Sequence, residues 1–178
     1  METASRRYPV GIQTFSEIRK GHYLYIDKTD FVWEMTRMKY VFLSRPRRFG
    51  KSLLTTTLDS YFKGQKELFE GLKIMELEKE WESYPVIHLD LSEAKNQETT
   101  ESLRNTLLLL MKPLVAEFGQ DSDELLPGQI LKGLIRRAYE KTGKQVVVVI
   151  DEYDAPLLDV LHQDALLPDY RRVMQEFF

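Results

Sequence analysis

Three observations predict an α/β fold with a mostly parallel sheet. Apolar segments of strand length alternate along the chain with stretches in which apolar residues recur at helical spacing. Residues 146–150 read VVVVI, and a strand that is apolar on both faces is typical of a central parallel strand covered on both sides. The chain has 178 residues, of which 43% are hydrophobic and 30% charged, so it can bury a core of its own.

The first elements are short. Thr14 stands three residues before a glutamate, as in a capping box, so a helix is expected to begin there and to end at Gly21. Residues 23–26 predict a short strand. Asp27 is expected to cap a second helix, whose buried stripe would consist of Phe31, Val32 and Met35.

The core elements follow in a repeating order. Residues 40–43 predict a strand, a basic loop follows, and the next helix places its apolar residues at Leu54, Leu58 and Tyr61. A shorter helical piece is expected around Leu68 and Leu72. Residues 86–92 predict a second strand. We expect residues 1–38 to form a lead-in that packs on a core of residues 39–178.

Two further helices precede the valine-rich strand. Pro113 lies inside the first and should kink or divide it, because proline lacks the N–H and clashes with the preceding turn. Its apolar face comprises Leu103, Leu107, Leu110, Leu114 and Phe118. The second helix is expected to start at Pro127 and to close at Gly143. Its inward residues would be Ile130, Leu131, Leu134, Ile135 and Ala138. The last residues, from Asp169, read as the start of a helix.

Composition excludes several classes of protein. The 25 basic and 28 acidic residues leave a net charge of −3, so direct nucleic-acid binding is not supported. There is no cysteine, which rules out disulfides and thiolate sites. Neither a membrane-spanning run nor a secretory signal is visible, so a cytoplasmic protein is expected. The three histidines are not spaced as metal ligands.

Residues 45–52 resemble a P-loop, the G-x-x-x-x-G-K-[ST] phosphate-binding segment. Gly50, Lys51 and Ser52 match, whereas Arg45 occupies the position of the first glycine. Gly50 would let the backbone approach phosphates, Lys51 would bridge the β and γ phosphates, and the Ser52 hydroxyl would ligate Mg²⁺. Backbone N–H groups at the helix start would complete an anion site.

The departure at Arg45 bears on the loop's geometry. The first glycine often adopts a conformation that other residues disfavour, and Pro46 removes one N–H donor. Arg47 and Arg48 could offset this loss by contacting phosphate, and the alternative for both is a solvated basic loop. The expected nucleotide-binding residues are Arg47, Arg48, Phe49, Gly50, Lys51, Ser52 and Leu53.

Residues 146–152 resemble a Walker B segment. Asp151 follows the valine-rich strand at its carboxyl end, where open α/β sheets bind ligands, and would hold Mg²⁺. Glu152 could act as the general base toward an attacking water. Lys51 and Glu152 are therefore the expected catalytic residues. The alternative for the carboxylates is a solvent-facing strand end.

Five blocks in order resemble the bacterial AAA-ATPase-like family of predicted ATPases: YPVGIQTF, YLYIDKT, FLSRPRRFGKSLL, VIHLDLS and VVVVIDEYDAPLL. The resemblance implies a P-loop NTPase of three α/β/α layers, ATP with Mg²⁺, and hydrolysis of the β–γ bond in the full-length protein. It also implies a sheet truncated after the Walker B strand, and often a C-terminal nuclease-like domain of the PD-(D/E)XK type. An arginine finger would come from another subunit, as in a homo-oligomer, or from the rest of the protein.

Other interpretations stay open. The domain could be a nucleotide-gated regulatory module with little turnover that controls a nuclease-like effector, or a degenerate fold used only for protein contacts. ATP rather than GTP rests on the resemblance alone. For Asp90 and Ser92, helix capping and loop hydrogen bonds are the preferred interpretation over a role in the nucleotide site. For Asp27, helix capping is preferred over a contact with the adenine or ribose. Trp33 and Trp81 favour packing.

Overall fold

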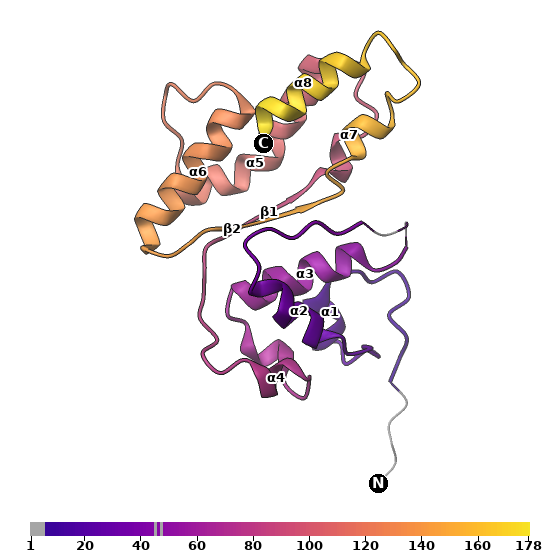
Figure 1. Cartoon of the computed structure of the whole chain (residues 1–178), viewed down its shortest axis with the longest axis vertical. Helices are drawn as coiled ribbons and strands as arrows, with labels where there is room; N and C mark the ends of the chain where they lie inside the picture. Colours follow the sequence, from indigo (N-terminus) through magenta and orange to yellow (C-terminus); the bar gives the residue numbers. More distant parts are fainter. Residues whose placement is uncertain (1–5, 45, 47) are drawn as a thin grey trace. The chain divides into compact units, whose positions relative to one another are not determined.

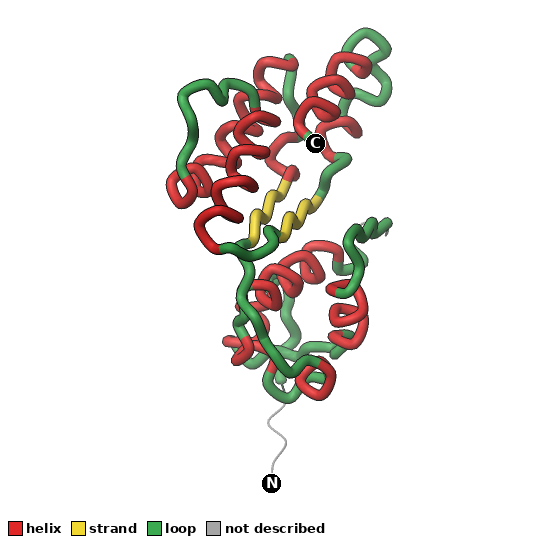
Figure 2. The backbone as a smooth tube through the Cα atoms, turned by 60° about the vertical axis from the view of Figure 1, so that its left-hand side comes forward, coloured by secondary structure: helices red, strands yellow, loops and turns green. Residues whose placement is uncertain are grey.

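The computed structural model describes residues 6–44, 46 and 48–178. The chain divides into two compact units, Met1–Tyr84 and Pro85–Phe178, which we call unit 1 and unit 2. The described residues of unit 1 form helices and irregular segments, and both strands lie in unit 2 (Figure 2). None of the helices among the described residues is both long and apolar enough to cross a membrane.

Unit 1 is a small helical assembly around an aromatic core. Its elements are α1 (Phe15–Lys20), α2 (Thr29–Thr36), α3 (Lys51–Phe62), the 3₁₀ helix η1 (Lys66–Phe69) and α4 (Ile74–Leu77). The core consists of Phe15, Val32, Tyr61, Leu68, Phe69, Leu72 and Ile74. The Phe15 and Phe69 rings lie 4.8 Å apart between centroids, and Trp81 stacks against Phe69 at 5.1 Å. The predicted packing role of Trp81 is thereby confirmed.

Asp27 and Thr29 join two helix starts in unit 1. The Asp27 carboxylate accepts hydrogen bonds from the backbone N–H of Thr29 at 2.9 Å and of Lys73 at 2.7 Å. The hydroxyl of Thr29 donates to the same carboxylate and accepts from the N–H of Ile74 at 3.1 Å. Partial burial opposes ionisation of Asp27, but these hydrogen bonds outweigh it and lower its pKa. Asp27 therefore accepts the first N–H of α2, but it is not the N-cap that was predicted, because Lys28 holds that position.

Three local predictions for unit 1 are wrong. Residues 23–26 and 40–43 form no strand, because no other described segment pairs with them in a ladder. Leu24 instead donates its N–H to the carbonyl of Arg7, and Tyr40 is 84% exposed. Phe31 was expected in the buried stripe of α2, yet it is 56% exposed, whereas Val32 is buried.

Unit 2 is built on two parallel strands. β1 (Val86–Asp90) pairs with β2 (Val147–Asp151) in a register that sets Val86 opposite Val147 and Asp90 opposite Asp151. The other elements are η2 (Leu91–Ala94), α5 (Thr100–Phe118), α6 (Pro127–Thr142), α7 (Ala155–Leu158) and α8 (Leu167–Phe177). Helices α5, α6 and α8 lie together on one side of the strands (Figure 1). The α/β class and the parallel pairing are confirmed.

The core of unit 2 forms between these strands and helices. Ile87, Leu89, Leu103 and Leu107 are nearly or fully inaccessible, and Tyr170, Val173 and Phe177 of α8 join them. α6 matches its prediction closely. It starts at Pro127, buries Ile130, Leu131, Leu134 and Ala138, and ends at Gly143, which adopts φ 67° at the left-handed C-cap.

Two expectations for unit 2 are corrected. Pro113 does not divide α5, which runs unbroken from Thr100 to Phe118 with the proline on its exposed side. The solvated side tolerates the lost N–H more readily than a buried side would. β2 is not a strand covered on both sides, because Val148 is 39% exposed and only β1 pairs with it among the described residues.

A buried ion pair closes the loop before α6. Glu124 is 8% exposed, and its carboxylate accepts from both terminal nitrogens of Arg137, at 2.7 and 2.9 Å. Hydrogen bonds from Arg137 lower the pKa of Glu124 against the effect of burial. Gly133 leaves the room this carboxylate needs, since a Cβ there would lie 1.7 Å from the Glu124 Oε1.

Candidate functional site

The P-loop-like segment lies in unit 1 and opens α3. Gly50 is the N-cap residue of this 12-residue helix and adopts φ 73°, a left-handed conformation that glycine accepts without strain. Its carbonyl accepts the N–H of Leu54 at 3.1 Å and so starts the helix. Among residues 6–44, 46 and 48–178, no atom lies within 4 Å of a Cβ built on Gly50, so these residues leave the space beside this backbone open.

Lys51 and Ser52 are the first two residues of α3, and both are partly buried. The N–H groups in the first turn of a helix point out of its N-terminal end and have no acceptor within the helix. Further along, Thr57 and Tyr61 anchor α3 in the core of unit 1. The Thr56 hydroxyl oxygen also accepts the Phe15 N–H at 3.1 Å, which ties α3 to α1. These contacts fix the direction in which the first turn points.

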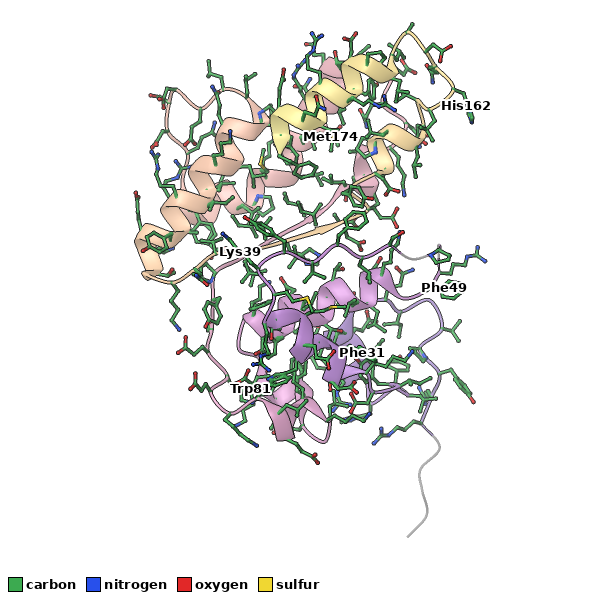
Figure 3. All side chains as sticks on the ribbon, in the orientation of Figure 1. Phe31, Lys39, Phe49, Trp81, His162 and Met174 are labelled. Atoms are coloured by element: carbon green, nitrogen blue, oxygen red, sulfur yellow. The ribbon has the colours of Figure 1, made fainter. Side chains whose placement is uncertain are left out.

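The loop before Gly50 is exposed and contains a second left-handed residue. Arg48 adopts φ 67°, which costs energy for a residue with a Cβ. Phe49 is 64% exposed and projects from the loop (Figure 3). Leu53, in contrast, packs against the core of unit 1. Arg45 and Arg47 lie outside the described residues, so the expectations for them stay predictions.

The acidic segment lies in unit 2, at the carboxyl ends of the two strands. The strand register places Asp90 and Asp151 opposite each other at this edge. Asp90 accepts the N–H of Ser92 at 2.8 Å and caps η2, which confirms the capping interpretation. Asp151 is 5% exposed, and its Oδ1 accepts the N–H of Glu152 at 3.0 Å.

Glu152 sits at the turn between β2 and α7 with φ 51°. Its carbonyl accepts the N–H of Ala155 at 2.9 Å, so the backbone is held on both sides of the residue. Its Oε2 lies 3.5 Å from the Nζ of Lys95, and the two side chains are 19% and 33% exposed. A left-handed residue other than glycine at a strand end is a strained arrangement of the kind found at functional sites.

Sequence reasoning missed Lys95. It follows η2 and lies 57 residues from Glu152 along the chain. The available signal was indirect, since Lys95 comes three residues after residues 86–92, which are predicted as a strand of a mostly parallel sheet. Parallel neighbours bring their following loops to the same edge of the sheet.

The donor types in these segments fit a magnesium nucleotide. Mg²⁺ prefers oxygen ligands and is held by one or two carboxylates together with substrate phosphates rather than by a protein cage. The hydroxyl of Ser52 and the carboxylate of Asp151 are donors of this kind. Residues 6–44, 46 and 48–178 contain no group of three His, Cys, Asp or Glu side chains that could hold a metal alone.

The strands and helices define an α/β protein with a parallel sheet. The chain belongs to the AAA-ATPase-like family, because the family model described as "Predicted AAA-ATPase" matches residues 9–178. It is therefore an ATPase-like domain.

A relative from Azotobacter chroococcum mcd 1 bears the name "Uncharacterized protein in vnfD 5'region" and is 33% identical over 178 residues. The match covers 97% of this chain and 34% of that protein, so the chain spans about a third of the relative's length. No solved structure matches the chain.

Proposed function

We propose that this chain is the ATP-binding P-loop domain of a Mg²⁺-dependent ATPase and that the full-length protein hydrolyses the β–γ bond of ATP. The observation that carries the proposal is the start of α3. Gly50, left-handed and beside open space, is followed directly by Lys51 and Ser52 in the first helical turn. That order of glycine, cation and hydroxyl at a helix N-terminus suits a bound polyphosphate.

Each residue then has a defined task. The Lys51 ammonium neutralises charge on the β and γ phosphates, and Arg48 adds a second cation. Ser52 and Asp151 would hold Mg²⁺, which would neutralise charge that develops on the phosphate oxygens. Glu152 orients a water and accepts its proton while the water oxygen bonds to the γ-phosphorus and the bond to the β–γ bridging oxygen breaks, which yields ADP and phosphate.

Family membership supports nucleotide use, and the buried carboxylate of Asp151 supports a metal role. The three-layer P-loop sandwich belongs to this proposal as well. So does the division into a lead-in of residues 1–38 and a core of residues 39–178.

Calorimetric titration of the chain with Mg-ATP tests the phosphate site. Lys51→Ala is expected to weaken binding at least tenfold, because it removes the cation that faces the phosphates. Lys66→Ala, which removes an exposed lysine of η1, serves as the matched control and should bind as the wild type does. Equal affinity of the wild type and Lys51→Ala would refute the P-loop assignment. A parallel titration with Mg-GTP measures base preference.

The acidic segment is tested separately. Asp151→Asn should weaken binding of Mg-ATP more than binding of ATP in EDTA, since only the former needs a metal ligand. Glu152→Gln should retain affinity while the steady-state hydrolysis rate falls about 10²-fold or more, in line with loss of a general base. Binding that depends on Lys51, with no measurable hydrolysis by either the wild type or Glu152→Gln, would favour the nucleotide-gated module instead.

A further inference from the structure

The segment that carries a further inference is the connection between the two units. Unit 1 ends at Tyr84 and unit 2 begins at Pro85, which directly precedes β1. The residues before that boundary, 78–84, contain no helix or strand and follow α4 directly. We call residues 78–84 the strap. Its contacts with α3, α4 and η1 lie within unit 1.

The strap begins at a carboxylate that accepts several hydrogen bonds. The Glu78 N–H donates to the Ile74 carbonyl at 2.8 Å, which fixes its backbone to α4. Its side chain accepts hydrogen bonds from the hydroxyl of Tyr61, a residue of α3, and from the backbone N–H of Glu80, the latter at 2.8 Å. Burial opposes ionisation of Glu78, but its hydrogen bonds outweigh this effect and lower its pKa. The charged carboxylate therefore holds the strap on α3.

The end of the strap is held on α3 as well. The Tyr84 N–H donates to the carbonyl of Phe62, the last residue of α3, at 2.7 Å, and the two rings lie 6.0 Å apart between centroids. Ser83 lies against Gly64, where an added Cβ would be 3.3 Å from the Ser83 Cβ. Only Pro85 then separates the anchored chain from β1. The closed strap therefore leaves almost no free chain between α3 and β1.

The middle of the strap opposes this closed state. Trp81 adopts φ 48°, a left-handed conformation that is strained for a bulky residue. Its ring, labelled in Figure 3, packs against Phe69 and Tyr61. Its Nε1 is buried yet meets no hydrogen-bond acceptor among the described residues, and a buried donor of this kind is destabilising. Both costs disappear when the strap leaves α3, because the backbone can relax and water can reach the indole.

We propose that the strap is a latch that keeps the connection between the two units short and that opens by local release of residues 78–84. The Glu78 carboxylate favours the closed latch, and the strained Trp81 favours the open one. Opening lengthens the free chain between the units from Pro85 alone to residues 78–85, so the two units gain freedom to change their relative orientation. The inference concerns this connection and does not rest on the nucleotide site.

Hydrogen exchange of the whole chain, followed by mass spectrometry, measures the opening of the latch. Glu78→Gln should raise the exchange rate of residues 78–84 about 5- to 30-fold, because it replaces a charged hydrogen-bond acceptor by a neutral one. Glu80→Gln, which changes an exposed carboxylate of the same segment, is the control and should stay within about twofold of the wild type.

Low concentrations of urea distinguish local opening from unfolding of unit 1. They should accelerate exchange in the strap less than in α3, since local opening exposes little surface. An equal dependence on urea in both segments overturns the inference. So does a Glu78→Gln chain that exchanges no faster than the wild type.

Two substitutions at Trp81 test the strain separately. Trp81→Ala and Trp81→Gly both remove the ring, but only glycine adopts φ 48° without strain. Exchange of the Tyr84 N–H, followed by NMR, should therefore be about two- to fivefold slower in Trp81→Gly than in Trp81→Ala. Where φ is negative, the opposite order is expected. Equal rates or the opposite order would overturn the inference, because no strain would then favour opening.

A distance measurement tests whether the latch restricts the two units. The chain has no cysteine, so Glu70→Cys in unit 1 and Lys132→Cys in unit 2, both at exposed positions, can carry a fluorophore pair. Single-molecule energy transfer should show a broader distribution of distances after Glu78→Gln and an unchanged distribution after Glu80→Gln. A distribution that Glu78→Gln leaves unchanged, despite faster exchange in the strap, overturns the latch.

Discussion

Replacing Gly128 by alanine should destabilise the chain, although helix propensity alone predicts the opposite. Gly128 is the second residue of α6 and is buried. A Cβ there would lie 2.0 Å from the carbonyl oxygen of Glu176 and 3.2 Å from the Cα of Phe177. Both atoms belong to the backbone of α8, so no change of side-chain rotamer relieves the overlap.

The magnitude follows from two opposing effects. Alanine in place of glycine in a helix stabilises by up to about 1 kcal/mol. To bring the new methyl to a contact distance of about 3.5 Å, α8 must shift by roughly 1.5 Å from its place on α6. Overpacking of this kind costs about 3 kcal/mol at the upper end of its usual range. We therefore expect a net loss of about 2 kcal/mol and, at about 2–4 °C per kcal/mol, a melting temperature lower by about 4–8 °C.

Urea and thermal denaturation followed by far-ultraviolet circular dichroism measure this loss. Lys132→Ala is the control, because it adds no atoms and lies on the exposed side of the same helix. Its free energy of unfolding should stay within about 0.5 kcal/mol of the wild type. A Gly128→Ala chain as stable as the wild type, or more stable, would show that α8 does not pack on the start of α6 and would refute the reasoning.

Three further substitutions probe buried polar contacts. Glu124→Gln should lower the free energy of unfolding by about 2–3 kcal/mol at pH 7, because it removes the buried charge that Arg137 contacts at two atoms and leaves Arg137 with the more exposed Asp121 as its ionic partner. Because Arg137 lowers the pKa of Glu124, the stabilisation by the ionised carboxylate is complete above the ordinary pKa of about 4.3 and is lost as the pH falls through the lowered pKa. The difference in the free energy of unfolding between Glu124→Gln and the wild type should therefore narrow in urea titrations toward about pH 3. A difference that does not change with pH would contradict this explanation. Tyr61→Phe removes the hydroxyl that donates to Glu78 and should lower the free energy of unfolding by about 1–2 kcal/mol. An unchanged free energy of unfolding would show that this hydrogen bond does not stabilise the fold. Thr29→Val should lower the free energy of unfolding by about 1–3 kcal/mol in the same assay, because it removes the hydroxyl that bonds to Asp27 and to the N–H of Ile74. Thr29→Ser keeps this hydroxyl and should lower it less. Equal losses for the two variants would show that packing, not the hydrogen bonds, is responsible.

The best-predicted elements are those whose signals are local. α6 carries its start in Pro127, its end in Gly143 and its buried face in the spacing between them, so each feature is read within 17 residues. The valines of residues 146–150 predict β2, and the alternation of strands and helices predicts a mostly parallel sheet, whereas the pairing of β2 with β1 comes from the structure. The glycine conformation at Gly50 likewise follows from neighbouring residues.

The failures depend on contacts between distant residues. Residues 40–43 have the composition of a strand, but a strand exists only where a second segment supplies the ladder, and apolar residues alone do not specify that segment. Lys95 reaches Glu152 across 57 residues, and Glu124 meets Arg137 only because the loop before α6 folds back. In each case, the contact is set by the fold rather than by adjacent residues.

The position of the two tryptophans gives the protein a built-in optical label. Trp33 and Trp81 both belong to unit 1, where the guanidinium of Arg37 lies 4.7 Å above the Trp33 ring and Tyr61 lies 5.6 Å from Trp81. Fluorescence excited at the indole absorption band therefore reports on the unit that contains Gly50 and Lys51. The helices of unit 2 contribute to circular dichroism without contributing any indole emission. A change in indole emission during a titration therefore reports a ligand effect on unit 1, with no label attached.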